Sequence, residues 1–87
     1  MRRVTFDSEA FDQFTDWATQ DKRVYDRIIN LINDTMRSPF KGIGKPEPLK
    51  HNLRGCWSRR ITSKHRLIYK VNDAEIIILS CNSHYDD

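Results

Sequence analysis

The chain has 87 residues, a formal net charge of +3 and hydrophobic side chains at 38% of its positions. This length predicts one small domain over residues 1–87, with a core that is marginal by itself. Because the sequence contains no long apolar run and no charged-then-apolar leader, we expect neither a membrane span nor a signal peptide.

A short strand and a first helix open the chain. Alternation at Val4 and Phe6 predicts a strand over residues 2–6. Aromatic residues then recur at helical spacing and predict a helix over residues 9–19, with Asp7 or Ser8 as its cap.

A second helix follows almost at once. Asp21 is a suitable cap, and a wide apolar face continues to about residue 37, where Pro39 ends the helix. The short link between the two helices predicts an antiparallel helical hairpin.

Positive charge is concentrated after this hairpin. Ten of the fifteen Lys and Arg residues lie between Arg37 and Lys70, and Glu47 is the only acidic residue between Asp34 and Asp73. This asymmetry indicates a surface that binds a polyanion and a carboxylate that acts on it.

Glu47 lies in a predicted loop over residues 38–50 that contains all three prolines. Pro46 and Pro48 restrict the backbone on both sides of it, which suits a carboxylate that must be aimed. Without further context, a solvated glutamate in a proline-rich turn explains the same pattern.

Strands are predicted after the loop, over residues 49–53, 56–62, 66–71 and 75–81. Trp57 and Ile61 alternate with Arg60, so an apolar face and a basic face result. If the second and third of these strands form a hairpin with an odd loop, most simply residues 63–65, then Arg60 and Arg66 share the face opposite the core. The last strand is apolar on both faces, which favours a position inside the sheet.

The order of elements predicts an α+β fold, with two helices on one face of a mostly antiparallel sheet of about four to five strands. Cys56 and Cys81 lack metal-type spacing and lie in strand-like runs, which favours buried thiols in a reducing cytosol over a disulfide. The histidines do not pair at helical spacing, so we expect no metal site and no cofactor.

Residue types suited to RNA cleavage gather on the sheet face away from the helices and at its rims. Lys50, Arg60 and Arg66 would lie on that face, with Glu47 at one rim and His84 and Tyr85 at another. A carboxylate, an imidazole and guanidinium groups can move the two protons and stabilise the crowded phosphate. A basic strand face that only binds phosphates, with a surface histidine nearby, explains the same residues, so the pattern alone indicates a nucleic-acid-binding domain.

Three stretches of the sequence closely resemble a known family. They are residues 44–53 (GKPEPLKHNL), residues 57–62 (WSRRIT) and residues 65–69 (HRLIY), followed by the terminal His84-Tyr85 pair. These motifs resemble the YoeB toxins, also called Txe, of the RelE/ParE superfamily of bacterial toxin–antitoxin systems, and the resemblance covers nearly the whole chain. Asp86-Asp87 extends the tail beyond the usual end of the family.

The resemblance implies a ribosome-dependent, metal-independent mRNA endonuclease that cuts mRNA in the A site of the 70S ribosome. It also implies inhibition by an acidic antitoxin of the YefM type, contact with operator DNA only through the antitoxin complex, and a homodimer. By the same resemblance Glu47 is the general base, His84 the general acid and Arg66 the group that stabilises the phosphate. The resemblance also implies that Lys50 and Arg60 position phosphates and that Tyr85 supports substrate placement. His51 and Arg59, in the same basic part of the chain, are further candidates for RNA contacts.

Three other functions remain open at this point. A ParE-like toxin would use the same fold to bind DNA gyrase without nuclease activity. A plain nucleic-acid-binding module would not need Glu47, and an inactivated toxin would keep the fold alone.

Overall fold

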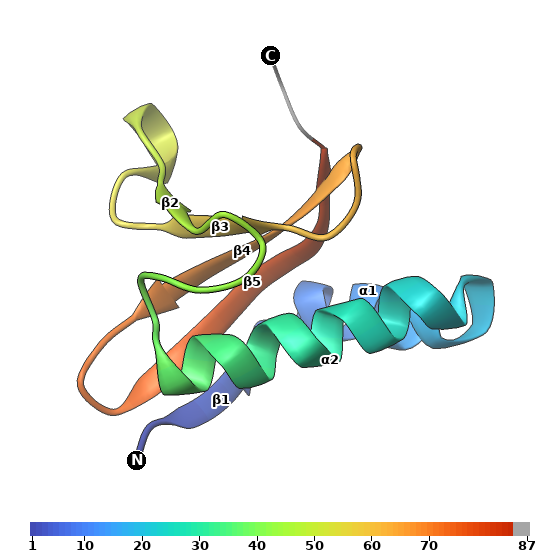
Figure 1. Cartoon of the computed structure of the whole chain (residues 1–87), viewed down its shortest axis with the longest axis horizontal. Coiled ribbons are helices and arrows are strands. Elements are labelled where there is room, and N and C mark those ends of the chain that lie inside the picture. The colour runs from blue at the N-terminus through green and yellow to red at the C-terminus, as the bar shows by residue number, and fades with distance from the viewer. Residues whose placement is uncertain (85–87) are drawn as a thin grey trace.

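The computed structural model describes residues 1–84 (Figure 1). The elements in chain order are β1 (Arg3–Phe6), α1 (Ser8–Gln20), α2 (Lys22–Arg37), β2 (Glu47–Pro48), the 3-10 helix η1 (His51–Leu53), β3 (Trp57–Arg60), β4 (His65–Val71) and β5 (Glu75–His84). No helix within residues 1–84 is long and apolar enough to cross a membrane.

The five strands form one sheet in the order β1-β5-β4-β3-β2. Pairing is antiparallel from β2 through β5, whereas β1 runs parallel to β5, with Val4 opposite Ile76. The predicted α+β fold is confirmed, and β5 lies inside the sheet as its two-sided apolar run suggested. A parallel pair needs a long connection, and here the chain from α1 to β4 separates β1 from β5, so β1 and β2 form the two edges of the sheet.

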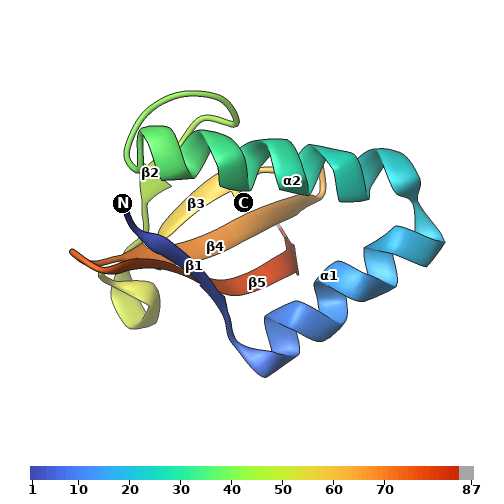
Figure 2. The same ribbon diagram turned by 90° about the horizontal axis from the view of Figure 1, so that it is seen from below.

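The helices begin and end close to the predicted residues. Asp21 caps α2, because its carboxylate accepts from the backbone N–H groups of Arg23 (3.0 Å) and Val24 (3.4 Å). The side chain of Asp7, in contrast, makes no capping bond at α1. Figure 2 shows the two helices diverging from the turn that joins them, so the predicted helical hairpin is splayed.

The core lies between the helices and one face of the sheet. It joins Ala10 of α1 and Ile28 and Leu31 of α2 to Leu67 and Tyr69 of β4, all fully buried. Burial of such side chains stabilises the fold by about 1.5–3 kcal/mol each. Leu67 and Tyr69 lie on the core face, as their alternation predicted. Arg66, next to Leu67 in the strand, therefore projects to the opposite face.

The β3–β4 hairpin has the predicted parity but a different loop. Arg60 lies opposite Arg66 and Ser58 opposite Ile68. His65 already belongs to β4, because its carbonyl accepts from the N–H groups of Ile61 (3.0 Å) and Thr62 (3.1 Å). The loop therefore lies one residue earlier than predicted.

The predicted strand over residues 49–53 is wrong. Leu49 N–H bonds to the carbonyl of Cys56 (2.9 Å), and the segment between them turns through η1. His51 and Gly55 have φ values of 60° and 93°, in the left-handed region that breaks an extended chain. The predicted loop over residues 38–50 is also shortened, because Glu47 and Pro48 form β2.

Candidate active site and nucleic-acid interface

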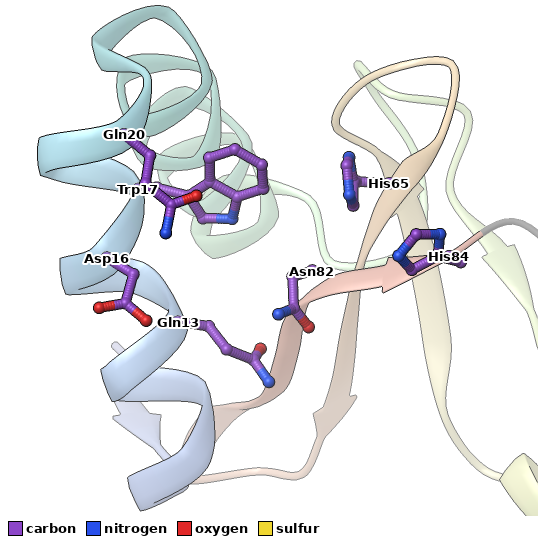
Figure 3. Close-up of a pocket in the computed structure, with 7 residues that line it drawn as sticks. All are labelled: Gln13, Asp16, Trp17, Gln20, His65, Asn82 and His84. Carbon is purple, nitrogen blue, oxygen red and sulfur yellow. The ribbon is translucent and has the colours of Figure 1, made fainter.

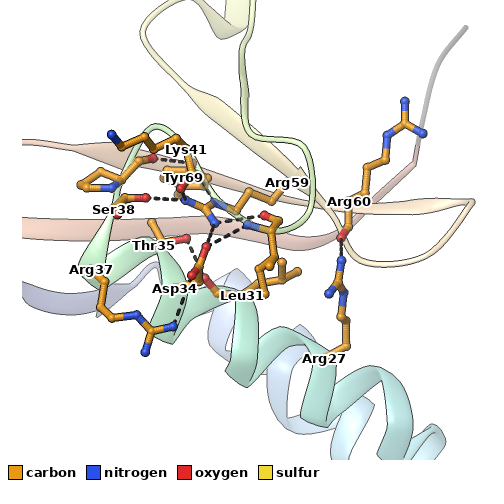
Figure 4. Close-up of polar contacts among 12 residues, drawn as sticks. Arg27, Leu31, Asp34, Thr35, Arg37, Ser38, Lys41, Arg59, Arg60 and Tyr69 are labelled. Atoms are coloured by element: carbon orange, nitrogen blue, oxygen red, sulfur yellow. Dashed lines mark hydrogen bonds and ion pairs between the residues drawn. The ribbon is translucent and has the colours of Figure 1, made fainter.

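The face of β2, β3 and β4 that points away from the helices is called the outer face below. Arg60 and Arg66 are direct partners across β3 and β4, and both belong to this face. Figure 4 shows the Arg60 side chain directed away from α2, while Arg27 of α2 donates to the Arg60 carbonyl (3.2 Å). Arg60 is exposed, whereas Arg66 is half-buried and its Nε atom is fully buried.

Glu47 lies on the same face, one strand further along. It pairs with Ser58, which is two residues from Arg60 and therefore projects to the same side of β3. Its segment is fixed just upstream, where the N–H of Arg60 donates to the carbonyl of Gly44 (2.7 Å). The pairing thus places the exposed Glu47 on the outer face, one strand from Arg60 and two strands from Arg66.

Lys50 and His51 follow β2 and are exposed. Lys50 immediately precedes η1, and His51 is its first residue. They therefore lie in the connection from β2 to β3, with exposed side chains.

Arg59 does not belong to this interface, so the predicted RNA contact is wrong. Its side chain is fully buried and points to the helix side of the sheet. It donates to Asp34 Oδ2 at 2.7 Å and to the Tyr69 hydroxyl at 3.2 Å. A buried guanidinium with these partners cannot reach a phosphate.

Sequence reasoning missed Asp34 as a member of this buried cluster. The Ile43 backbone N–H and the Arg59 guanidinium both bond to its carboxylate and lower its pKa below the ordinary value of 3.8. The sequence did contain a signal for the burial of Arg59, because alternate residues of a strand share a face and Arg59 alternates with the apolar Trp57 and Ile61.

His84 lies at the end of β5, and its side chain does not share the outer face with Arg66. It pairs with His65, whereas its neighbour Ser83 pairs with Arg66, so the His84 and Arg66 side chains leave the sheet on opposite sides. The rings of His84 and His65 are 4.9 Å apart between centroids, and the His65 ring is 5.2 Å from that of Trp17 in α1.

A cavity of about 150 Å³ opens beside these histidines, lined by Gln13, Asp16, Trp17, Gln20, His65, Asn82 and His84 (Figure 3). Burial, the charge of His84 and then that of Lys64 lower the pKa of His65 below its ordinary value of 6.5. His65 therefore favours its neutral form at this end of the sheet.

Tyr85 lies outside the described residues. Within residues 1–84, no group of three or more His, Cys, Asp or Glu side chains is arranged to hold a metal ion. The groups at hand on the outer face are a carboxylate that can accept a proton and guanidiniums that can bind a phosphate.

Comparison with known proteins shows the family of the chain. Residues 6–85 match the model of the YoeB-like toxins of bacterial type II toxin–antitoxin systems. The chain belongs to this family. It is 51% identical to the toxin YoeB of Escherichia coli strain K12 over 95% of this chain and 99% of that one. It is 49% identical to the toxin YoeB of Streptomyces coelicolor, again over 95% of this chain and 99% of the relative.

Solved structures of YoeB proteins have the same fold. A YoeB/ParE toxin from Agrobacterium tumefaciens superposes with a TM-score of 0.91 at 38% identity, over 95% of this chain and 99% of that one. A YoeB dimer from Staphylococcus aureus superposes with a TM-score of 0.90 at 42% identity, over 97% of this chain and 98% of that one. The S. aureus protein has also been solved in a YoeB–YefM complex, whose toxin gives a TM-score of 0.88 at 41% identity, over 98% of this chain and 99% of that one. The family resemblance read from the sequence motifs is thereby confirmed.

Proposed function

We propose that this YoeB-family toxin is an endoribonuclease that cuts mRNA in the A site of the ribosome and so stops translation. The observation that carries the proposal is the position of Glu47 on the outer face, on the strand next to that of Arg60, with Arg66 opposite Arg60 one strand further. Family membership, identified through the match over residues 6–85, supports the assignment as a toxin.

In the proposed reaction Glu47 accepts the proton of a ribose 2′-hydroxyl as its oxygen attacks the adjacent phosphorus. A 2′,3′-cyclic phosphate forms, the bond to the 5′-oxygen breaks, and that oxygen takes a proton from an acid. Arg66 stabilises the negative charge that gathers on the phosphate, because its planar fork can donate two bonds to the oxygens. Arg60, Lys50 and His51 bind neighbouring phosphates, and no metal ion or cofactor takes part.

His84 is proposed as that acid, with Tyr85 supporting the placement of the substrate. In the described structure the His84 ring packs against His65 on the other side of the sheet from Arg66. The end of β5 must therefore turn for His84 to act, and substrate binding on the outer face would provide the free energy for that change.

The proposed partners are an acidic YefM-type antitoxin, the 70S ribosome with its mRNA, operator DNA through the antitoxin complex, and a second copy of the toxin. The basic outer face is complementary to an acidic antitoxin segment, and the S. aureus structures show that related YoeB proteins form a YefM complex and a dimer. We further propose that the bound antitoxin covers the outer face and displaces the chain end at His84. Identical placement of residue 84 in free and antitoxin-bound protein would contradict the displacement.

Comparing cleavage of one mRNA with and without ribosomes tests the proposed function. Primer extension should map cuts in codons that occupy the A site, and the rate on free RNA should be lower, because the ribosome holds the scissile bond in position. Such positioning can be worth on the order of 7–11 kcal/mol. Equal rates on both substrates would contradict ribosome dependence, and residual cleavage of free RNA that persists in a chelator would support a metal-independent reaction.

The alternative of a ParE-like gyrase inhibitor is tested in the same preparation. A gyrase-binding toxin would inhibit supercoiling at concentrations that leave mRNA intact. Unimpaired gyrase together with ribosome-dependent cuts would exclude this alternative.

A further inference from the structure

We infer that Arg59 is a positioning residue for Glu47, acting from inside the protein through the loop over residues 38–44. The inference rests on the proposed role of Glu47. It assigns to Arg59 a function other than the RNA contact expected from the sequence, because the Arg59 side chain is fully buried.

The buried Arg59 guanidinium binds the backbone of this loop (Figure 4). Its Nη2 donates to the carbonyls of Ser38 (2.6 Å) and Lys41 (3.0 Å), and its Nη1 donates to the carbonyl of Ile43 (3.0 Å). These three carbonyls lie along the loop, so one side chain fixes the path of the backbone between α2 and β2.

Two further side chains complete the cluster. Asp34 accepts from Arg59 Nη1 (2.7 Å) and, through the same oxygen, from the Ile43 N–H (2.9 Å). The Tyr69 hydroxyl accepts from Arg59 Nε (3.2 Å) and donates to the carbonyl of Pro39 (2.7 Å). The five N–H donors of the guanidinium are thereby all used.

A buried charge whose donors are all satisfied specifies one arrangement of its partners, since any other leaves a costly unpaired group. The same strand transmits this arrangement to the site. Arg60 N–H holds the carbonyl of Gly44, and Ser58 pairs with Glu47. Arg59 lies between Ser58 and Arg60 on β3. It therefore fixes the loop to the strand with which Glu47 pairs.

Gly42 shows how closely the loop approaches the cluster. A Cβ there would lie 2.1 Å from Asp34 Oδ2, and the residue has a φ of 121°, which favours glycine. Replacing Gly42 by alanine should therefore push the Asp34 carboxylate aside and loosen the loop, while Arg59, Asp34 and Tyr69 all keep their side chains.

The test uses Tyr69→Phe and Gly42→Ala, because Arg59 variants risk failing to fold. Each should lower kcat for cleavage of ribosome-bound mRNA by up to about a hundredfold, as expected for a small misplacement of a catalytic group. KM should stay unchanged, and amide exchange at Ile43 should become faster. Tyr25→Phe is the matched control, since Tyr25 lies in α2 and is stacked on Phe14, away from the loop.

A double mutant decides between positioning and simple stability. If Arg59 acts through Glu47, adding Tyr69→Phe to Glu47→Gln should cost no further activity. The positioning role would be overturned if the double mutant lost activity by the product of the two single-variant losses. It would also be overturned if Tyr69→Phe had an unchanged kcat although amide exchange at Ile43 became faster. Full activity of Glu47→Gln alone would instead overturn the proposed function, and with it the reason for aiming Glu47.

Discussion

Arg60 and Arg66 lie directly opposite each other on β3 and β4, on the sheet face away from the helices. Like charges opposed on neighbouring strands oppose folding, and the function proposed above gives this pair a polyanion to bind. Glu47 lies on the same face, one strand from Arg60.

This pair should contribute to RNA binding by neutralising phosphates. Arg60→Gln is expected to weaken binding of single-stranded RNA and to reduce the slope of log K against log salt by about 0.7 for each phosphate that the variant no longer neutralises. Arg23→Gln, the same charge change at an exposed site near the start of α2, should leave the slope unchanged. Binding measured over a salt series checks this, and equal slopes for the two variants would contradict it.

His65 should make the fold less stable in mild acid. Its pKa is lowered, so the folded chain binds the proton less readily than the unfolded chain, and the stabilisation present above pH 6.5 is lost as the pH falls through the lowered pKa. Burial, the charge of His84 and that of Lys64 all act in this direction.

Denaturant unfolding at pH 7, 6 and 5 measures this effect, with His65→Phe as the comparison because it keeps a ring against Trp17. Between pH 7 and pH 5 the wild-type protein should lose more free energy of unfolding than the variant does. The same loss in both proteins would show that His65 is not the responsible group.

Asp34 should stabilise the fold at neutral pH and cease to do so in acid. Its lowered pKa means that its contribution is present above about pH 4 and disappears as the pH falls through the folded-state value. Asp34→Asn leaves the buried Arg59 charge uncompensated and is expected to cost about 3 kcal/mol at pH 7. Unfolding of both proteins across pH 7 to pH 3 should show the difference shrinking, and a constant difference would contradict the argument.

Cys81 should be inert in the folded protein. Its side chain is fully buried beside the Ala10 carbonyl, and burial raises the pKa of the thiol to about 12. In a Cys56→Ala background, labelling of Cys81 at pH 8 is expected to be more than about a thousandfold slower than in denaturant, because the thiolate is the reactive form. Comparable labelling rates in the two conditions would refute this.

The spacing of apolar residues correctly predicted the helices and strands that bury one face. The apolar face of α2, capped by Asp21 and ended before Pro39, fixed that helix almost to the residue. Strand parity likewise put Arg60 and Arg66 on one face, because the alternation of β3 and β4 must match across the hairpin.

Arg59 and His84 depended on long-range interactions that periodicity does not contain. The charge of Arg59 predicted an exposed side chain. Burial is favourable because the guanidinium bonds to Asp34, 25 residues earlier in the chain, and to carbonyls of the loop that follows α2. His84 follows a uniformly apolar run, and irregularities in the β4–β5 register change the parity along β5. Its position beside His65 could not be deduced without the structure.

The most direct test of the account is the effect of Glu47→Gln on mRNA cleavage in a purified translation system. Glutamine keeps the shape of the side chain but cannot accept the 2′-hydroxyl proton, so the cleavage rate should fall by about 10²–10⁴-fold while the fold is retained. Glu9→Gln, the same change at an exposed site in the first turn of α1, should cleave as the wild type does. Primer extension that shows ribosome-dependent cuts for wild type and Glu9→Gln but not for Glu47→Gln would support the account. Undiminished cuts with Glu47→Gln would contradict it.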